Sequence, residues 1–188
     1  MQINQALATA IFLTGTIAMA QSNDPSVNQR RENQQDRIAN GVQSGQLTAG
    51  ETKNLEGREA NLNREIRDDR QANGGKLTQR EKQQVNQQQN RVSNSIYNDK
   101  HNANTAHYGN NQVGQRRENQ QDRIAQGIHS GSLTAGQTAH LENQQQGINQ
   151  KVAADRQANG GKLTAQQKGQ INRAQNRASR NIYKDKHS

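Results

Sequence analysis

Apolar residues recur along the chain at helical spacing and are separated by long polar stretches. Two runs in the first half step by seven and then four residues: Leu55, Leu62 and Ile66, followed by Val85, Val92 and Ile96. These steps place the side chains on one face of an α-helix, whereas a strand would alternate every second residue. The second half shows the same steps, so the pattern predicts an all-α fold.

The chain contains two copies of one unit. Residues 30–101 align without gaps with residues 116–187, and 43 of the 72 aligned positions are identical. Such self-similarity indicates a duplication. Each copy is expected to form three helices, which in the first copy span about 28–42, 48–70 and 78–99. The predicted organisation is a signal peptide (1–20), an N-terminal arm (21–28), a helical module (29–101), a turn-rich linker (102–114) and a second module (115–188).

Four short motifs of the form Gly-x-Leu-Thr-x-x-Glu/Gln mark predicted helix starts. A threonine followed three residues later by Glu or Gln is a capping box, in which the two side chains bond to free backbone N–H groups. The leucine before the threonine can pack as a hydrophobic staple, and the glycine permits the turn. The predicted capping residues are Thr48, Thr78, Thr134 and Thr164.

A polar residue interrupts the apolar stripe of each long helix: Glu59, Gln89, Gln145 and Gln175. We expect these positions to lie at a solvent-exposed helix edge. The alternative is a ladder of polar side chains that sets the register between helices, as polar core positions do in coiled coils.

The predicted core of the first copy is thin, with about a dozen sizeable apolar side chains: Val27, Ile38, Val42, Leu47, Leu55, Leu62, Ile66, Leu77, Val85, Val92, Ile96 and Tyr97. Their burial is comparable to, or smaller than, the conformational entropy lost on ordering about 70 residues. We therefore expect added stability from self-association, from docking of the two copies, or from a ligand.

The segment 1–20 carries no charged side chain and ends in Ala18-Met19-Ala20. A short apolar run before a small-x-small motif is typical of a cleaved signal peptide, which predicts a secreted or periplasmic protein. The alternative is a short buried helix. The chain has no cysteine, which excludes disulfides and thiolate metal sites. No later segment is apolar enough to predict a membrane span.

The loops resemble the second half of an EF-hand calcium loop, with a glycine, an aliphatic residue and a final glutamate at the matching positions. Two tentative calcium sets result, namely Asn40, Ser44 and Glu51, and Asp69, Asn73 and Glu81. The first half of each loop lacks the usual acidic ligands, and the second copy has glutamine at the final position. We favour a metal-free, EF-hand-like helix-loop-helix and expect no cofactor.

The chain is basic, with 25 Lys and Arg against 16 Asp and Glu. Its tentative polyanion-binding residues are Arg30, Arg31, Arg37, Arg116, Arg117 and Arg123. Acidic residues interleave with them and no aromatic residue lies nearby, which argues against sequence-specific nucleic-acid binding. No catalytic motif occurs, so we do not expect an enzyme.

The motifs RENQQDRIA(N/Q)G, SGxLTAG and SxxIYxDKH resemble those of small, secreted, uncharacterised bacterial helical proteins that occur singly or in tandem. The resemblance implies export and a repeated helical unit. The leading hypothesis is an exported, non-catalytic structural protein that self-associates into oligomers or filaments. Alternatives are a calcium-responsive binding module and a binder of extracellular DNA or polysaccharide.

Overall fold

The computed structural model describes residues 25–188, which form six α-helices and no strand. The helices are α1 (Pro25–Gln43), α2 (Ala49–Ala72), α3 (Gln79–Lys100), α4 (Gln112–His129), α5 (Ala135–Ala158) and α6 (Ala165–Lys186). The all-α prediction is confirmed for this part of the chain. The predicted signal peptide, and residues 21–24 of the predicted arm, lie outside the described residues.

The helix starts follow the capping motifs. Thr48, Thr78, Thr134 and Thr164 are the N-caps of α2, α3, α5 and α6, and each forms a reciprocal capping box with the residue three positions later. These boxes satisfy backbone N–H groups that the first helical turn leaves without partners. The sequence signal therefore specifies where the four helices begin.

The end of α1 depends on close packing between a glycine and the leucine of the next motif. The Leu47 N–H donates to the Gly41 carbonyl oxygen at 2.9 Å, and a Cβ atom on Gly41 would lie 2.6 Å from Leu47 Cδ1. The chain reverses at Gly45, whose φ of 72° favours glycine. Gly127 and Leu133 repeat the packing at the end of α4. This contact folds the chain back so that α2 starts beside α1.

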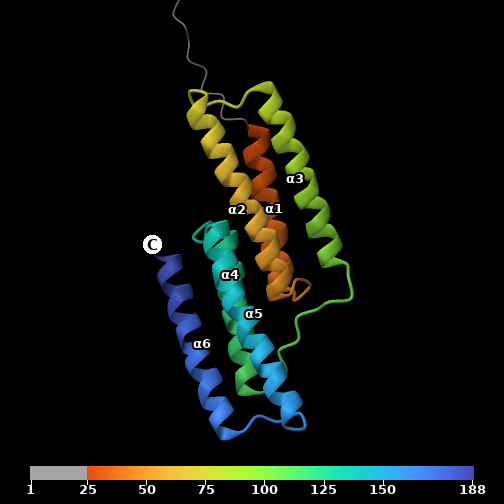
Figure 1. Ribbon diagram of the computed structural model, residues 1–188, viewed down its shortest axis with the longest axis vertical. Helices are drawn as coiled ribbons and strands as arrows, with labels where there is room; N and C mark the ends of the chain where they lie inside the picture. Colours follow the sequence, from red (N-terminus) through yellow and green to blue (C-terminus); the bar gives the residue numbers. More distant parts are fainter. Residues whose placement is uncertain (1–24) are drawn as a thin grey trace, which may run out of the picture.

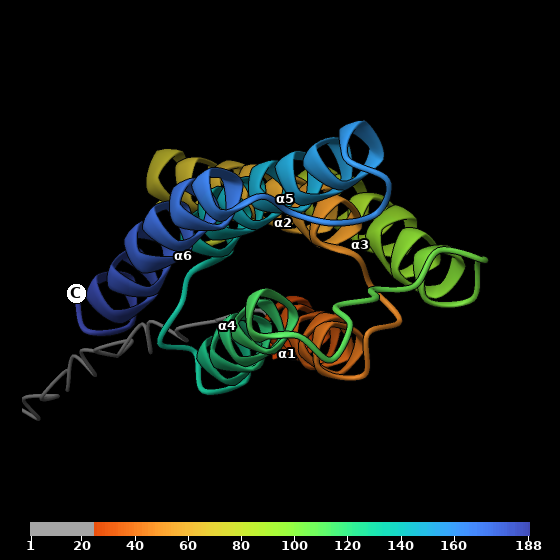
Figure 2. The same ribbon diagram turned by 90° about the horizontal axis from the view of Figure 1, so that it is seen from below.

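Like helices pair between the two copies, α1 with α4 and α2 with α5. Within each copy, the third helix packs against the first two. In Figure 1 the two halves are related by an approximate two-fold rotation, and Figure 2 shows α1 and α4 together on one side of α2 and α5. The helices α3 and α6 flank this central group of four.

The central hydrophobic core is shared by both copies. It contains pairs of equivalent residues, 86 positions apart, such as Ile38 with Ile124 and Leu55 with Leu141. Two smaller clusters lie within the individual copies, one around Val85 and the other around Ile171. Docking of the two copies, one of the three expected sources of stability, is therefore part of the fold.

Every residue of the predicted first-copy core is buried except Tyr97, whose prediction is wrong. Tyr97 is 58% exposed, as is its equivalent Tyr183 at 62%. Each tyrosine ring stacks on the histidine four residues later, His101 or His187, with ring centroids 4.2 and 4.3 Å apart. One turn of helix separates the two side chains of each pair, so they meet on the outer surface of α3 or α6.

None of the helices in residues 25–188 combines the length and apolar character that a membrane crossing requires.

Candidate functional site

A network of buried glutamines connects the helices of each copy. On α1, Gln34 Nε2 donates to the Gln89 carbonyl oxygen at 2.7 Å and to Ser93 Oγ at 2.9 Å. On α3, Gln89 Nε2 donates to the Val27 carbonyl oxygen at 2.9 Å. The second copy repeats these bonds with Gln120, Gln175, Ser179 and Val113. Because each amide reaches a defined backbone or hydroxyl oxygen, the network fixes the register of α1 on α3 and of α4 on α6.

The expected exposure of the polar stripe positions is wrong. Glu59, Gln89, Gln145 and Gln175 are at most 1% exposed. The stripe of α3 faces α1, and Gln89 there reaches the carbonyl of Val27 on that helix. Gln145 Nε2 likewise donates to Gln120 Oε1 at 3.2 Å, between α5 and α4. The ladder interpretation describes Gln89, Gln145 and Gln175 better than the exposed one. Within residues 25–188, neither carboxylate oxygen of Glu59 has a hydrogen-bond partner.

Two equivalent glutamates, Glu56 on α2 and Glu142 on α5, are fully buried. Gln35 Nε2 donates to Glu56 Oε2 at 3.1 Å, and Gln121 Nε2 donates to Glu142 Oε2 at 2.9 Å. Burial raises the pKa of each carboxyl group to about 8, an effect that the glutamine hydrogen bond opposes. At neutral pH the protonated, uncharged form of each group therefore predominates.

A third buried carboxyl group occurs in the first copy only. Burial raises the pKa of Glu59 to about 7, while the positive charge of Arg31 opposes the increase. Its equivalent in the second copy is Gln145, an uncharged side chain of similar shape. Within residues 25–188, His, Cys, Asp and Glu side chains nowhere form a group of three or more that could hold a metal ion. The hydrogen bonds of Glu56 and Glu142 join α2 to α1 and α5 to α4.

The tentative calcium residue Glu51 is occupied by protein donors. Its Oε2 accepts from the N–H and hydroxyl groups of Thr48, at 2.9 and 2.7 Å. Its Oε1 accepts from the side-chain amides of Asn102 and Asn104, at 2.8 and 3.0 Å. Hydrogen bonding lowers the pKa of this carboxyl group, although partial burial opposes the change. Glu51 thus caps α2 and holds the linker at the same time.

The other two residues of this set, Asn40 and Ser44, lie at the end of α1. Asn40 is exposed, and its carbonyl oxygen accepts from the N–H of Ser44 at 3.0 Å. The Ser44 hydroxyl group donates to the Gly41 carbonyl oxygen and to Gln46 Oε1, at 3.3 and 3.1 Å. These bonds stay within the turn and do not bring the two residues to Glu51, so the first predicted set remains a prediction.

The second tentative calcium set is brought together around a side-chain amide. Asn73 Nδ2 donates to the Asp69 carbonyl oxygen at 2.8 Å and to both carboxylate oxygens of Glu81, at 2.9 and 3.0 Å. The Thr78 N–H also donates to Glu81. The Asn73 amide nitrogen therefore occupies the side of the Glu81 carboxylate that a calcium ion would have to approach. Calcium binding at this set stays a prediction.

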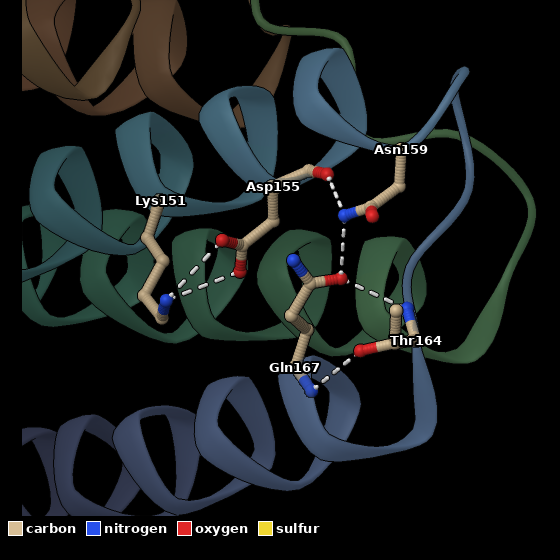
Figure 3. Close-up of polar contacts among 5 residues, drawn as sticks. All are labelled: Lys151, Asp155, Asn159, Thr164 and Gln167. Atoms are coloured by element: carbon tan, nitrogen blue, oxygen red, sulfur yellow. Dashed lines mark hydrogen bonds and ion pairs between the residues drawn. The ribbon is translucent and has the colours of Figure 1, made fainter.

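The second copy forms the same loop without the glutamate (Figure 3). Asn159 Nδ2 donates to the Asp155 carbonyl oxygen and to Gln167 Oε1, at 2.7 and 3.0 Å. Gln167 Oε1 also accepts from the N–H of Thr164 at 2.9 Å, while the Asp155 carboxylate pairs with Lys151. Because the Gln167 amide oxygen accepts from both Asn159 and the Thr164 N–H, this loop forms without an acidic capping residue.

Five of the six tentative polyanion-binding arginines donate hydrogen bonds within the protein. Four of them bridge the first helix of a copy to the third: Arg30 to Asn90, Arg37 to the Ser93 carbonyl oxygen, Arg116 to Asn172 and Asn176, and Arg123 to the Ser179 carbonyl oxygen. Arg117 instead contacts the linker and lies over the Tyr108 ring, so the expectation that no aromatic residue lies near these arginines is wrong for Arg117. These guanidinium groups therefore connect helices, and polyanion binding has no further support.

No family model matches the chain, and neither a curated protein nor a solved structure is similar to it.

The linker provides contacts that the sequence analysis missed. The Ala106 N–H donates to the Gly45 carbonyl oxygen at 2.9 Å. Arg117 donates to the His107 carbonyl oxygen at 3.5 Å and lies over the ring of Tyr108, with its guanidinium carbon 5.1 Å from the ring centroid. Burial raises the pKa of the Tyr108 hydroxyl group far above its usual value. A lone tyrosine in a polar, turn-rich segment was the only sequence signal that could have indicated this.

Proposed function

We propose that the protein is an exported, non-catalytic interaction protein whose repeats pair face to face, both within one chain and between chains. The pairing of like helices, α1 with α4 and α2 with α5, is the observation that carries this proposal. An interface between like elements is isologous, so the same surface serves on both sides.

The two pairing faces share central apolar residues, although α2 and α5 differ at other positions, such as Lys53 against Ala139 and Ala60 against Gln146. Four core positions of this face are identical in both copies, namely Ile38, Ala39, Leu47 and Leu55 and their equivalents Ile124, Ala125, Leu133 and Leu141. A face from one chain can therefore meet the matching face of another chain with similar complementarity. Pairing between chains leaves each chain a second copy to pair further, which allows oligomers or filaments to grow.

The linker favours pairing within the chain. It spans residues 102–114 and is held by Glu51 and by Gly45, both in the first copy. A short tether gives the second copy a high effective concentration near the first. Pairing between chains is consequently expected at high protein concentration or after changes to the linker.

Each copy is best described as a pair of EF-hand-like helix-loop-helix units that share their middle helix. Support comes from the loops, where a glycine at positive φ and a buried or half-buried leucine precede the capping threonine. The uncharged capping partners Gln137 and Gln167 in the second copy suit a structural role for these loops. Secretion or a periplasmic location is part of the same proposal and rests on the sequence of residues 1–20.

Light scattering of the chain without residues 1–20 tests self-association. We expect a concentration-dependent increase in mass, and a larger fraction of oligomers when residues 103–107 are deleted so that the copies cannot pair within one chain. The control is a variant in which as many Gly and Ser residues are added to the linker as the deletion removes. Its mass distribution should resemble that of the parent protein. A strict monomer at high concentration for all three proteins, with and without calcium, contradicts the proposal.

A further inference from the structure

The two-fold arrangement of the copies creates two equivalent surface grooves, and the linker fills one of them. The filled groove lies between α4 and the loop that joins α1 to α2. Its contents are the segment Ala106–Tyr108, which bonds to Gly45 on one wall and to Arg117 on the other. The segment has no regular secondary structure, and the Tyr108 ring lies beneath the Arg117 guanidinium group.

The equivalent groove lies between α1 and the loop that joins α4 to α5. It is a cavity of about 470 Å³, with Arg31, Gln35 and Asp36 on one wall and His129 and Gly131 on the other. Arg31 and Gly131 stand 86 positions from Arg117 and Gly45, the two residues that hold the linker. Within residues 25–188 the structure thus contains the same binding elements a second time.

Equivalent residues are more deeply buried in the groove that the linker fills than in the other groove. Arg117 is 7% exposed and Gln121 is 2% exposed, whereas their equivalents Arg31 and Gln35 are only half-buried. A Cβ atom on Gly45 would lie 3.4 Å from the Ala106 carbonyl oxygen, but one on Gly131 would meet no atom within 4 Å. The second groove is therefore not covered by a peptide segment of residues 25–188, although His129 Nδ1 donates to Asp36 Oδ1 across it at 3.1 Å.

The two copies differ at the position where the linker turns into α4. There, Gly114 lets the carbonyl groups of Tyr108 and Gly109 approach the helix so closely that a Cβ atom would collide with both oxygens. The equivalent position on α1 is Asn28, which carries a Cβ atom. Carbonyl groups cannot approach Asn28 as closely as those of Tyr108 and Gly109 approach Gly114, so a segment in the open groove enters it without that turn.

We propose that the open groove binds an extended peptide segment of another polypeptide, with a tyrosine ring beneath Arg31 and a backbone N–H donated to the Gly131 carbonyl oxygen. The bound linker shows what such a ligand needs: a small residue, one further residue and then tyrosine, in the order of Ala106, His107 and Tyr108. Cation–π contact with the ring and backbone hydrogen bonds supply the recognition. The groove lies within one chain, so this binding does not depend on self-association.

A synthetic peptide with the sequence of residues 102–109 is the probe. Its binding to the chain without residues 1–20 is measured by calorimetry and by amide NMR shifts at low protein concentration, where the protein is a monomer. We expect shifts at His129 and Gly131, and an affinity loss of about tenfold when the peptide tyrosine is replaced by alanine.

The two arginines provide a matched pair of protein variants. Arg31→Ala should weaken peptide binding about tenfold, whereas Arg117→Ala, in the filled groove, should leave the shifts at Gly131 unchanged. Thermal unfolding of both variants checks that they fold. Equal binding to the parent protein and the Arg31→Ala variant, or no binding at all, overturns the proposal.

Two other occupants of the open groove would give distinct results. Either result would overturn the assignment of the groove to a segment of a different protein. Shifts at Gly131 that appear on raising the protein concentration, without peptide, assign the groove to a second copy of this chain. Shifts at Gly131 caused by removing residues 21–24 assign it to the residues before α1.

Discussion

Lys53 on α2 donates a hydrogen bond from Nζ to Oε1 of Gln146 on α5, at 2.9 Å across the interface between the copies. The two residues are 93 positions apart in the sequence. A Cβ atom on Gly50, one turn earlier on α2, would lie 2.9 Å from Gln146 Nε2. The end of the Gln146 side chain therefore packs directly against Gly50 of α2.

The buried carboxyl groups predict that stability falls as the pH rises. The pKa of Glu56 and of Glu142 is about 8 in the folded protein, against 4.5 for a free side chain, and that of Glu59 is about 7. Between the pKa of the free side chain and the pKa in the folded protein, the folded state binds more protons than the unfolded state. The free energy of unfolding therefore decreases from about pH 4.5 to pH 8 and then levels off. The melting temperature should fall by several degrees between pH 5 and pH 8.

Replacing all three acids by glutamine, which already occupies the equivalent of Glu59, should flatten this dependence and raise the melting temperature at pH 8. Glu118→Gln, an exposed substitution, is the control and should leave the slope unchanged. An unaltered slope in the triple variant would show that other groups cause the pH dependence.

The close packing of Gly41 predicts opposite effects for two glycine-to-alanine substitutions. Gly41→Ala should destabilise the protein by about 1–3 kcal/mol, because its methyl group overlaps Leu47. Gly57→Ala, on α2 with no atom within 4 Å of the added Cβ, should stabilise it by about 0.5–1 kcal/mol through helix propensity. Urea unfolding measures both, and a stabilising effect of Gly41→Ala would contradict the packing described.

The glutamine ladder predicts a large cost for losing one buried donor. Gln34→Ala removes bonds to the Gln89 carbonyl oxygen and Ser93 Oγ, and should lower the free energy of unfolding by about 1–3 kcal/mol. Asn33→Ala, at the exposed neighbouring position, should change it by less than about 0.5 kcal/mol. Equal effects in chemical unfolding would show that the ladder adds nothing beyond helix formation.

Local signals in the sequence predicted much of the fold. The capping motifs and the steps of seven and four residues place α2, α3, α5 and α6, because caps and amphipathic faces depend on residues close in sequence. The burial of Gln89 and Gln175 could not be predicted in the same way. Their partners, the carbonyl oxygens of Val27 and Val113, lie 62 residues away on another helix.

The candidate groove was beyond the reach of local patterns. Residues 102–114 have the composition of a linker, yet Tyr108 is covered by Arg117 because the two copies dock with like helices together. The exposed Tyr97 shows the opposite error, since a helical apolar position adjacent to Ile96 looks like core until the position of α3 at the flank is known. Both outcomes depend on how the copies are arranged.

Pairing between chains is the central claim, and cross-linking tests it most directly because the chain has no cysteine of its own. Lys53→Cys in one batch and Gln146→Cys in another place single thiols on opposite sides of the interface. After co-incubation at high concentration and treatment with a short bis-maleimide, we predict covalent dimers that contain one chain of each variant. A mixture of Lys53→Cys with Lys76→Cys, an exposed loop position, is the control. Cross-links only within the Lys53→Cys/Gln146→Cys double variant, and none between the mixed single variants, would contradict the claim.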